Sequence, residues 1–190
     1  MTKVKWPDIE KRLDYLDKPE LIEVLRDLFQ SSKTNRAFLA IRFLDQGDGG
    51  EALEEYRKRI VDQVYPKRGF GKLNLGDARR SIREYHKTTS DLAGTIDLLL
   101  TYVEKGTDFT NDFGDINEGF YDSLESALGE MANLLKTPEG IDLYPRFQKR
   151  IAALSKKAYG IGWGYGDAVA DQVEDLEAYM GEQWEGKSQT

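Results

Sequence analysis

Residues 92–103, with the sequence LAGTIDLLLTYV, are the most apolar part of the chain. Its large apolar side chains recur at helical spacing, at Leu92, Ile96, Leu99, Leu100 and Val103. Thr89 or Ser90, just before it, is suited to cap a helix N-terminus. We therefore predict a buried helix at the centre of the protein.

The same spacing of apolar residues recurs on both sides of this stretch. Two helix starts carry a capping residue followed three positions later by an acid, namely Asp17 with Glu20 and Asn74 with Asp77. No segment of useful length alternates with the period of two that marks a β-strand. The sequence therefore predicts an all-α protein of eight or nine helices, in an orthogonal or repeat-like array.

Composition is that of an ordinary globular protein. The chain has 190 residues, of which 39% are hydrophobic and 32% charged. No change in composition marks a linker, so we expect a single helical domain over residues 1–184 and a flexible tail over 185–190. No apolar run is long enough to span a membrane, and the N-terminus lacks the apolar core of a signal peptide. We expect a cytoplasmic protein that does not contact membranes.

Several kinds of chemistry are excluded by residues the chain lacks. It has no cysteine and one histidine, His86. Disulfides, thiolate zinc sites, iron–sulfur clusters and cysteine nucleophiles are therefore impossible, as are metal sites built from several imidazoles. No P-loop, dinucleotide, kinase or nucleophile-elbow motif is present. We expect no cofactor.

Charge is distributed unevenly along the chain. The net charge is −7. Residues 64–87 carry seven basic and two acidic side chains, whereas residues 165–185 carry seven acidic side chains and no basic one. An acidic protein is a poor general ligand for nucleic acid, because neutralisation of phosphates supplies most of that affinity. The segregation of charge favours a charged surface for a partner instead.

The basic segment contains a glycine-rich loop followed by a helix. The candidate ligand-binding residues of the loop are Lys67, Arg68, Gly69, Gly71 and Lys72. Glycines, cations and a helix N-terminus together favour an anion such as a phosphate or a carboxylate. On the helix, Arg79, Arg83 and Lys87 are four residues apart and share one face. The alternatives are a tight turn with solvated cations, or pairing with acids of the same chain.

Asp97 is the one carboxylate inside the apolar stretch. A charge in such a helix needs a partner, and Arg79, Arg83 or Lys72 is the expected counter-ion. Thr101 and Glu104 share its side of the helix. We expect a structural ion pair rather than a catalytic group.

Two further segments carry candidate residues. Residues 107–118 are rich in oxygen ligands, so Asn111 is a candidate ligand-binding residue, and Asp112 and Asp115 are weak metal candidates. The spacing does not match a calcium-binding hand, and capping of the next helix by Asp115 or Asn117 is the favoured explanation. Residues 160–167 alternate glycine with large side chains. There Trp163 either contacts a partner or plugs the core, while the last helix begins at Gly166-Asp167.

The chain resembles a bacterial family of domains of unknown function, DUF6155. The resemblance covers most of the chain and lies in residues 66–72 (PKRGFGK), 91–98 (DLAGTIDL), 109–116 (FTN and FGDI) and 162–164 (GWG), with a similar stretch at 16–35. It implies a small helical domain and no particular activity.

Three hypotheses of function follow. The leading one is a non-enzymatic interaction or ligand-binding module, which uses residues 67–87 to engage an acidic protein or a phosphate-bearing ligand. The second is an enzyme for a divalent metal or a phosphate ligand, which requires Asp97, Asn111, Asp112 and Asp115 to converge near Lys72 and Trp163. The third, and less favoured, is a weak binder of the nucleic-acid backbone.

Overall fold

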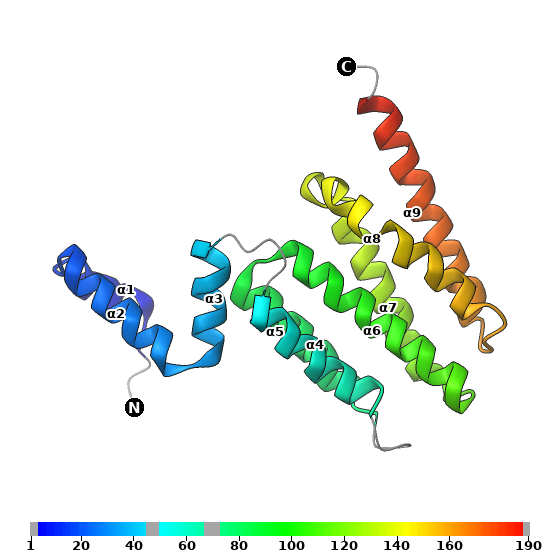
Figure 1. Ribbon diagram of the computed structural model, residues 1–190, viewed down its shortest axis with the longest axis horizontal. Coiled ribbons are helices and arrows are strands. Elements are labelled where there is room, and N and C mark those ends of the chain that lie inside the picture. Colours follow the sequence, from blue (N-terminus) through cyan, green and yellow to red (C-terminus); the bar gives the residue numbers. More distant parts are fainter. Residues whose placement is uncertain (1–3, 45–49, 67–72, 188–190) are drawn as a thin grey trace. The chain divides into compact units, whose positions relative to one another are not determined.

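The computed structural model describes residues 4–44, 50–66 and 73–187 (Figure 1). All the regular elements in these ranges are α-helices, nine in number, which confirms the all-α prediction at the upper end of the expected number. They are α1 (Trp6–Leu13), α2 (Lys18–Ser31), α3 (Lys33–Leu44), α4 (Gly50–Val64), α5 (Leu75–Thr89), α6 (Leu92–Phe113), α7 (Glu118–Leu135), α8 (Pro138–Ala158) and α9 (Tyr165–Lys187). None of the described helices is both long enough and apolar enough to cross a membrane.

Contacts between helices group the chain into two compact units, Met1–Gln46 and Gly47–Thr190. The single domain expected over residues 1–184 stays a prediction, and each unit is described by itself.

In the first unit, α2 begins with the predicted capping box. The Asp17 carboxylate accepts a hydrogen bond from the Glu20 amide at 2.9 Å, and Glu20 Oε2 accepts one from the Asp17 amide at 2.8 Å. None of the described side chains of this unit is buried.

The second unit is built around α6. This helix contacts α4, α5, α7 and α8, and 14 of its 22 residues are buried. α9 packs on α7 and α8 (Figure 1). The prediction that residues 92–103 form a central buried helix is therefore confirmed.

The residue that caps α6 is Asp91, not Thr89 or Ser90. Asp91 Oδ1 accepts a hydrogen bond from the Gly94 amide at 3.0 Å, and Tyr85 Oη donates one to Asp91 Oδ2 at 2.5 Å. Thr89 is the last residue of α5, and Ser90 ends that helix in the left-handed region with φ 54°. A Cβ on Gly94 would lie 2.3 Å from both Tyr85 Oη and Asp91 Oδ2, so a larger residue here would have to displace these two side chains.

The acidic segment after Thr107 is mostly helix rather than loop. α6 continues to Phe113, because Thr107 and Phe109 are fully buried and hold this end of the helix against the core. α7 is capped by Asn117, whose Oδ1 accepts a hydrogen bond from the Phe120 amide at 3.0 Å. Of the two predicted capping residues, Asn117 is therefore the one used.

Trp163 does not plug the core. Its side chain is 60% exposed, and its φ of 59° lies in the left-handed region, between Gly160 and Gly164 with φ of 78° and 75°. The buried aromatic residue is Tyr165, which begins α9 and whose Oη hydrogen-bonds Thr107 Oγ1 at 2.7 Å. The aromatic side chain of this segment that packs into the core is therefore Tyr165 and not Trp163.

Candidate binding site

Asp97 lies at the meeting point of three helices. From α4, Arg57 donates from Nη2 to Asp97 Oδ2 at 2.7 Å and from Nε at 3.2 Å. From α8, Arg150 donates from Nη1 to Asp97 Oδ1 at 2.6 Å. The Asp97 side chain is 9% exposed, so its charge is compensated by two guanidinium groups largely out of water.

Arg150 extends this ion-paired cluster along α6. It donates to Glu104 from Nε at 3.0 Å and from Nη2 at 2.6 Å, and to Thr101 Oγ1 at 3.2 Å. The predicted polar side of α6, formed by Asp97, Thr101 and Glu104, is therefore real, and one arginine contacts all three residues. Burial disfavours the charged form of Arg150, but the carboxylates outweigh it and the pKa of its guanidinium is raised.

Of the counter-ions expected for Asp97, Arg79 and Arg83 were wrong. Arg79 instead pairs with Glu130 of α7, at 2.6 Å between Nη2 and Oε2, and stacks over the Tyr102 ring at 5.8 Å from its centroid. Arg83 is exposed, and Lys72 lies outside the described residues. All three charged groups of the Arg57–Asp97–Arg150 cluster have ion-pair partners within the fold, and the structural role expected for Asp97 stays a prediction.

The polar residues near the end of α6 have separate partners. Asn111 Nδ2 donates to the Lys157 carbonyl at 2.9 Å, and Tyr65 Oη donates to Asp112. Asp115 Oδ1 accepts from Tyr121 Oη at 2.9 Å, and its other oxygen lies close to where a Cβ on Gly162 would be. Each side chain joins the end of α6 to another helix or loop of the unit.

These residues do not converge with Asp97. Asn111 lies 14 positions after Asp97 in α6, which is roughly 21 Å along a helix. Among the described residues, no group of three His, Cys, Asp or Glu side chains is placed to hold a metal ion. The arrangement required by the enzyme hypothesis is therefore absent from the part of the chain that the structure describes.

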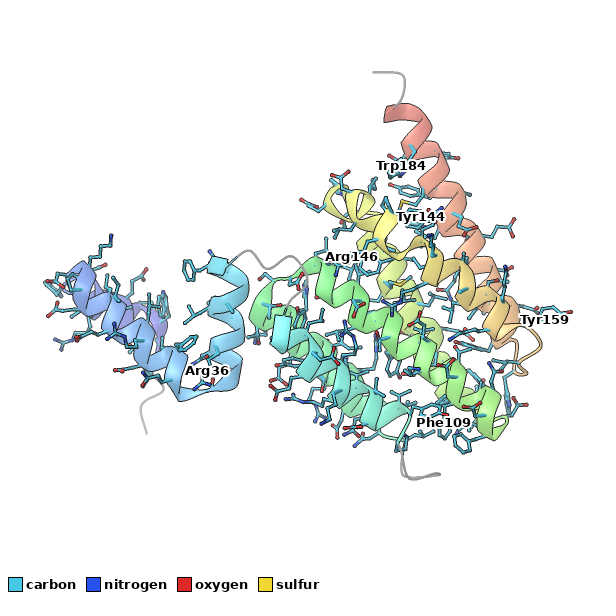
Figure 2. All side chains as sticks on the ribbon, in the orientation of Figure 1. Arg36, Phe109, Tyr144, Arg146, Tyr159 and Trp184 are labelled. Carbon is cyan, nitrogen blue, oxygen red and sulfur yellow. The ribbon has the colours of Figure 1, made fainter. Side chains whose placement is uncertain are left out.

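Asp108 is the centre of a second ion-paired cluster, one turn before Asn111. It accepts from Lys105 Nζ and from Lys157 Nζ, each at 2.8 Å, and so joins α6 to α8. Burial opposes ionisation of this carboxyl, but the two ammonium groups outweigh it and hold its pKa below the ordinary value. Phe109 and Tyr159, at the neighbouring ends of α6 and α8, are labelled in Figure 2.

The exposed basic residues of α5 are Arg80, Arg83 and Lys87, which we call the basic stripe. They follow each other at i, i+3 and i+7 and so share one face of the helix. Arg80 pairs with Asp77 at 2.8 Å. Arg83 and Lys87 have no ion pair with any residue that the structure describes. The stripe differs by one residue from the predicted set, because Arg79 points toward α7 and only 15% of its side chain is exposed.

The loop candidates Lys67, Arg68, Gly69, Gly71 and Lys72 lie outside the described residues. Their flanks are described. The Asn74 amide donates to the Gln63 carbonyl at 3.2 Å, so the chain returns to the end of α4 before α5 begins. Asn74 caps α5 as predicted, with its Oδ1 accepting from the Asp77 amide at 3.3 Å. The described residues Gln63 and Asn74, on either side of the basic loop, are therefore joined by a hydrogen bond beside the N-terminus of α5.

Sequence analysis missed Arg57 and Arg150 as partners of Asp97. Both occupy edge positions of apolar faces. Arg57 follows the buried Tyr56, and Arg150 precedes the buried Ile151. An arginine next to a buried residue in a predicted helix is a weak sign of a partly buried ion pair. It is the one sequence feature that could have indicated Arg57 and Arg150 as partners of Asp97.

The fold and these clusters define an all-α protein whose central helix is held by ion pairs and whose α5 exposes two basic residues, Arg83 and Lys87, that have no ion pair with a described residue. Beyond that class, the comparisons with known proteins add no identity: no family model, no curated protein and no solved structure matches the chain.

Proposed function

We propose that this protein is a non-enzymatic interaction module that binds an acidic protein surface through the basic stripe of α5. One observation carries the proposal. Arg57, Arg59, Arg79, Arg80 and Arg150 are all ion-paired within the fold, whereas Arg83 and Lys87 are exposed and have no ion pair with a described residue. Arg83 and Lys87, on adjacent turns of α5, are therefore exposed positive charges that an acidic partner can pair with.

A second helix, α8, also carries exposed cations, so the proposal that an acidic partner binds α5 can be tested against it. Lys149 and Lys156 of α8 are also exposed and have no ion pair with a described residue. However, α8 packs against the acidic helix α9, whereas α5 packs on α4 and α6. The acids of α9 weaken the positive potential around α8, so α5 is the better attractor of an acidic partner.

An acidic protein is a better partner than nucleic acid because of the charge of the whole chain. With a net charge of −7, the protein as a whole disfavours a long polyphosphate, which would pass over acidic as well as basic surface. A folded acidic partner touches that surface alone. We also infer a cytoplasmic location, on the grounds given by the sequence.

The test uses fluorescently labelled poly-glutamate as the acidic probe, with binding followed by anisotropy at low ionic strength. The variant Arg83→Glu/Lys87→Glu reverses the two unpaired charges of the stripe. The variant Lys149→Glu/Lys156→Glu makes the same change of net charge on α8 and is the matched control. We expect the first variant to lose about tenfold or more in affinity, and the control to bind nearly as wild type does.

Two results would overturn the proposal. Equal losses in the two variants would mean that overall charge, not the stripe, governs binding. Binding of single-stranded DNA in preference to poly-glutamate would favour the nucleic-acid hypothesis instead. Circular dichroism of both variants checks that the helices are intact.

A further inference from the structure

The outer face of α9 is the most strongly acidic surface among the described residues. Its exposed acids on one face are Asp167, Asp171, Glu174, Asp175 and Glu182. Their spacing of three, four and seven residues places them along one side of the helix, opposite the buried Val169, Val173, Leu176 and Met180. None of these acids has an ion pair with a residue that the structure describes. We call this surface the acidic face.

Repulsion along the acidic face is not relieved within the fold. Asp167 and Asp171, and then Asp171 and Asp175, are like charges four residues apart, and such pairs destabilise a helix. A basic surface placed against this face removes that repulsion. The acidic face therefore favours a cationic partner for the same physical reason that the basic stripe favours an anionic one.

The basic stripe and the acidic face of one chain lie on separate sides of the second unit. α5 packs on α4 and α6, and α9 packs on α7 and α8, so the pair α6–α7 stands between the two surfaces (Figure 1). The stripe of one chain is thus complementary in charge to the acidic face of another copy.

We propose that the acidic partner is a second copy of this chain, whose acidic face docks on the basic stripe in a head-to-tail manner. This inference rests on the proposed function of the stripe and names its partner. Because the two surfaces differ, each copy keeps one of them free after pairing, so association continues beyond a dimer unless a ring closes. The contact is made mainly of exposed ion pairs, which are individually weak and screened by salt, so the association is weak and salt-sensitive.

The experiment is sedimentation velocity of the full chain over a range of protein concentrations, in about 0.02 M and about 0.5 M salt. At low salt, the average mass should rise with concentration without stopping at a dimer. At high salt it should return to that of the monomer. A chain that stays monomeric at low salt, or whose association is unaffected by salt, contradicts the proposal.

Charge-reversal variants test which surfaces are involved. Arg83→Glu/Lys87→Glu and Asp171→Lys/Asp175→Lys should each be monomeric alone, and a mixture of the two should associate again, because each then meets a complementary surface. Lys149→Glu/Lys156→Glu, with the same charge change as the first variant, should associate as wild type does. Loss of association in this control, or none in the mixture, overturns the proposal.

The two proposals fail in distinguishable ways. If poly-glutamate binds through the stripe while the chain remains monomeric, the proposed function stands and self-association is wrong. If poly-glutamate binding does not depend on Arg83 and Lys87, the function of the stripe is wrong, and self-association through it falls as well.

Discussion

Asp97 should contribute to stability through its ion pairs with Arg57 and Arg150. Replacing it with Asn leaves the guanidinium groups of Arg57 and Arg150 without their shared anion. We expect a loss of about 3 kcal/mol in the free energy of unfolding, at the low end for a buried pair because both arginines are partly exposed. Glu54→Gln, which removes the exposed partner of Arg57, should cost less than about 1 kcal/mol. Urea unfolding of both variants measures the difference, and similar small losses would contradict a structural role for Asp97.

Gly94 offers a second test at this scale. In Gly94→Ala the new methyl group meets Tyr85 Oη and Asp91 Oδ2 at 2.3 Å, so the hydrogen bond that caps α6 must break or the helices must separate. We expect a loss of about 2 kcal/mol or more, because a cap and core packing are disturbed together. In the control, Gly76→Ala, no atom lies within 4 Å of the new Cβ.

The control should be neutral or gain up to about 1 kcal/mol, because alanine favours a helix over glycine. Thermal unfolding compares the two variants. A stable Gly94→Ala variant would show that the close approach of Tyr85 to α6 does not constrain the protein.

At the scale of elements, the contact between α6 and α8 should depend on pH through Asp108. Its pKa is lowered in the folded state, so its contribution to stability is complete above the unfolded-state pKa of about 4 and is lost as pH falls through the folded-state value. Asp108→Asn should therefore destabilise the protein at neutral pH and make stability depend less on pH below about 4. Urea titrations at several pH values test this. An unchanged pH dependence would rule out the contribution of Asp108.

The same scale shows what local sequence can predict. The caps at Asp17, Asn74 and Asn117 were predictable because each cap and its target amide are three residues apart. The cap of α6 was misplaced because Thr89, Ser90 and Asp91 are adjacent and all able to cap. The end of α6 was missed because its acidic last turns look like a loop, whereas the buried Thr107 and Phe109 keep them helical.

The candidate site was harder to predict because its contacts are distant in sequence. Arg57 and Arg150 lie 40 and 53 residues from Asp97, and no local pattern encodes that pairing. Arg79 and Arg83 look equivalent in the sequence, yet only Arg79 faces Glu130 of α7. Which basic residues are free for a partner is therefore decided by packing between helices.

At the scale of the whole molecule, the two units differ in burial. No described side chain of residues 4–44 is buried, whereas α6 is mostly buried. Amides that open only with the loss of a core exchange slowest with solvent. We expect hydrogen exchange to be slowest in α6 and much faster in α1 and α2, as measured peptide by peptide with mass spectrometry. Equal protection in α2 and α6 would contradict this picture of the first unit.

Packing between helices leaves Arg83 and Lys87 of α5 exposed, and we propose that these two charges bind an acidic partner. The most direct measurement is the affinity of poly-glutamate for Arg83→Glu/Lys87→Glu compared with Lys149→Glu/Lys156→Glu. We expect the affinity to fall by about tenfold or more in the first variant and to be nearly unchanged in the second. Equal affinities in the two variants would contradict it.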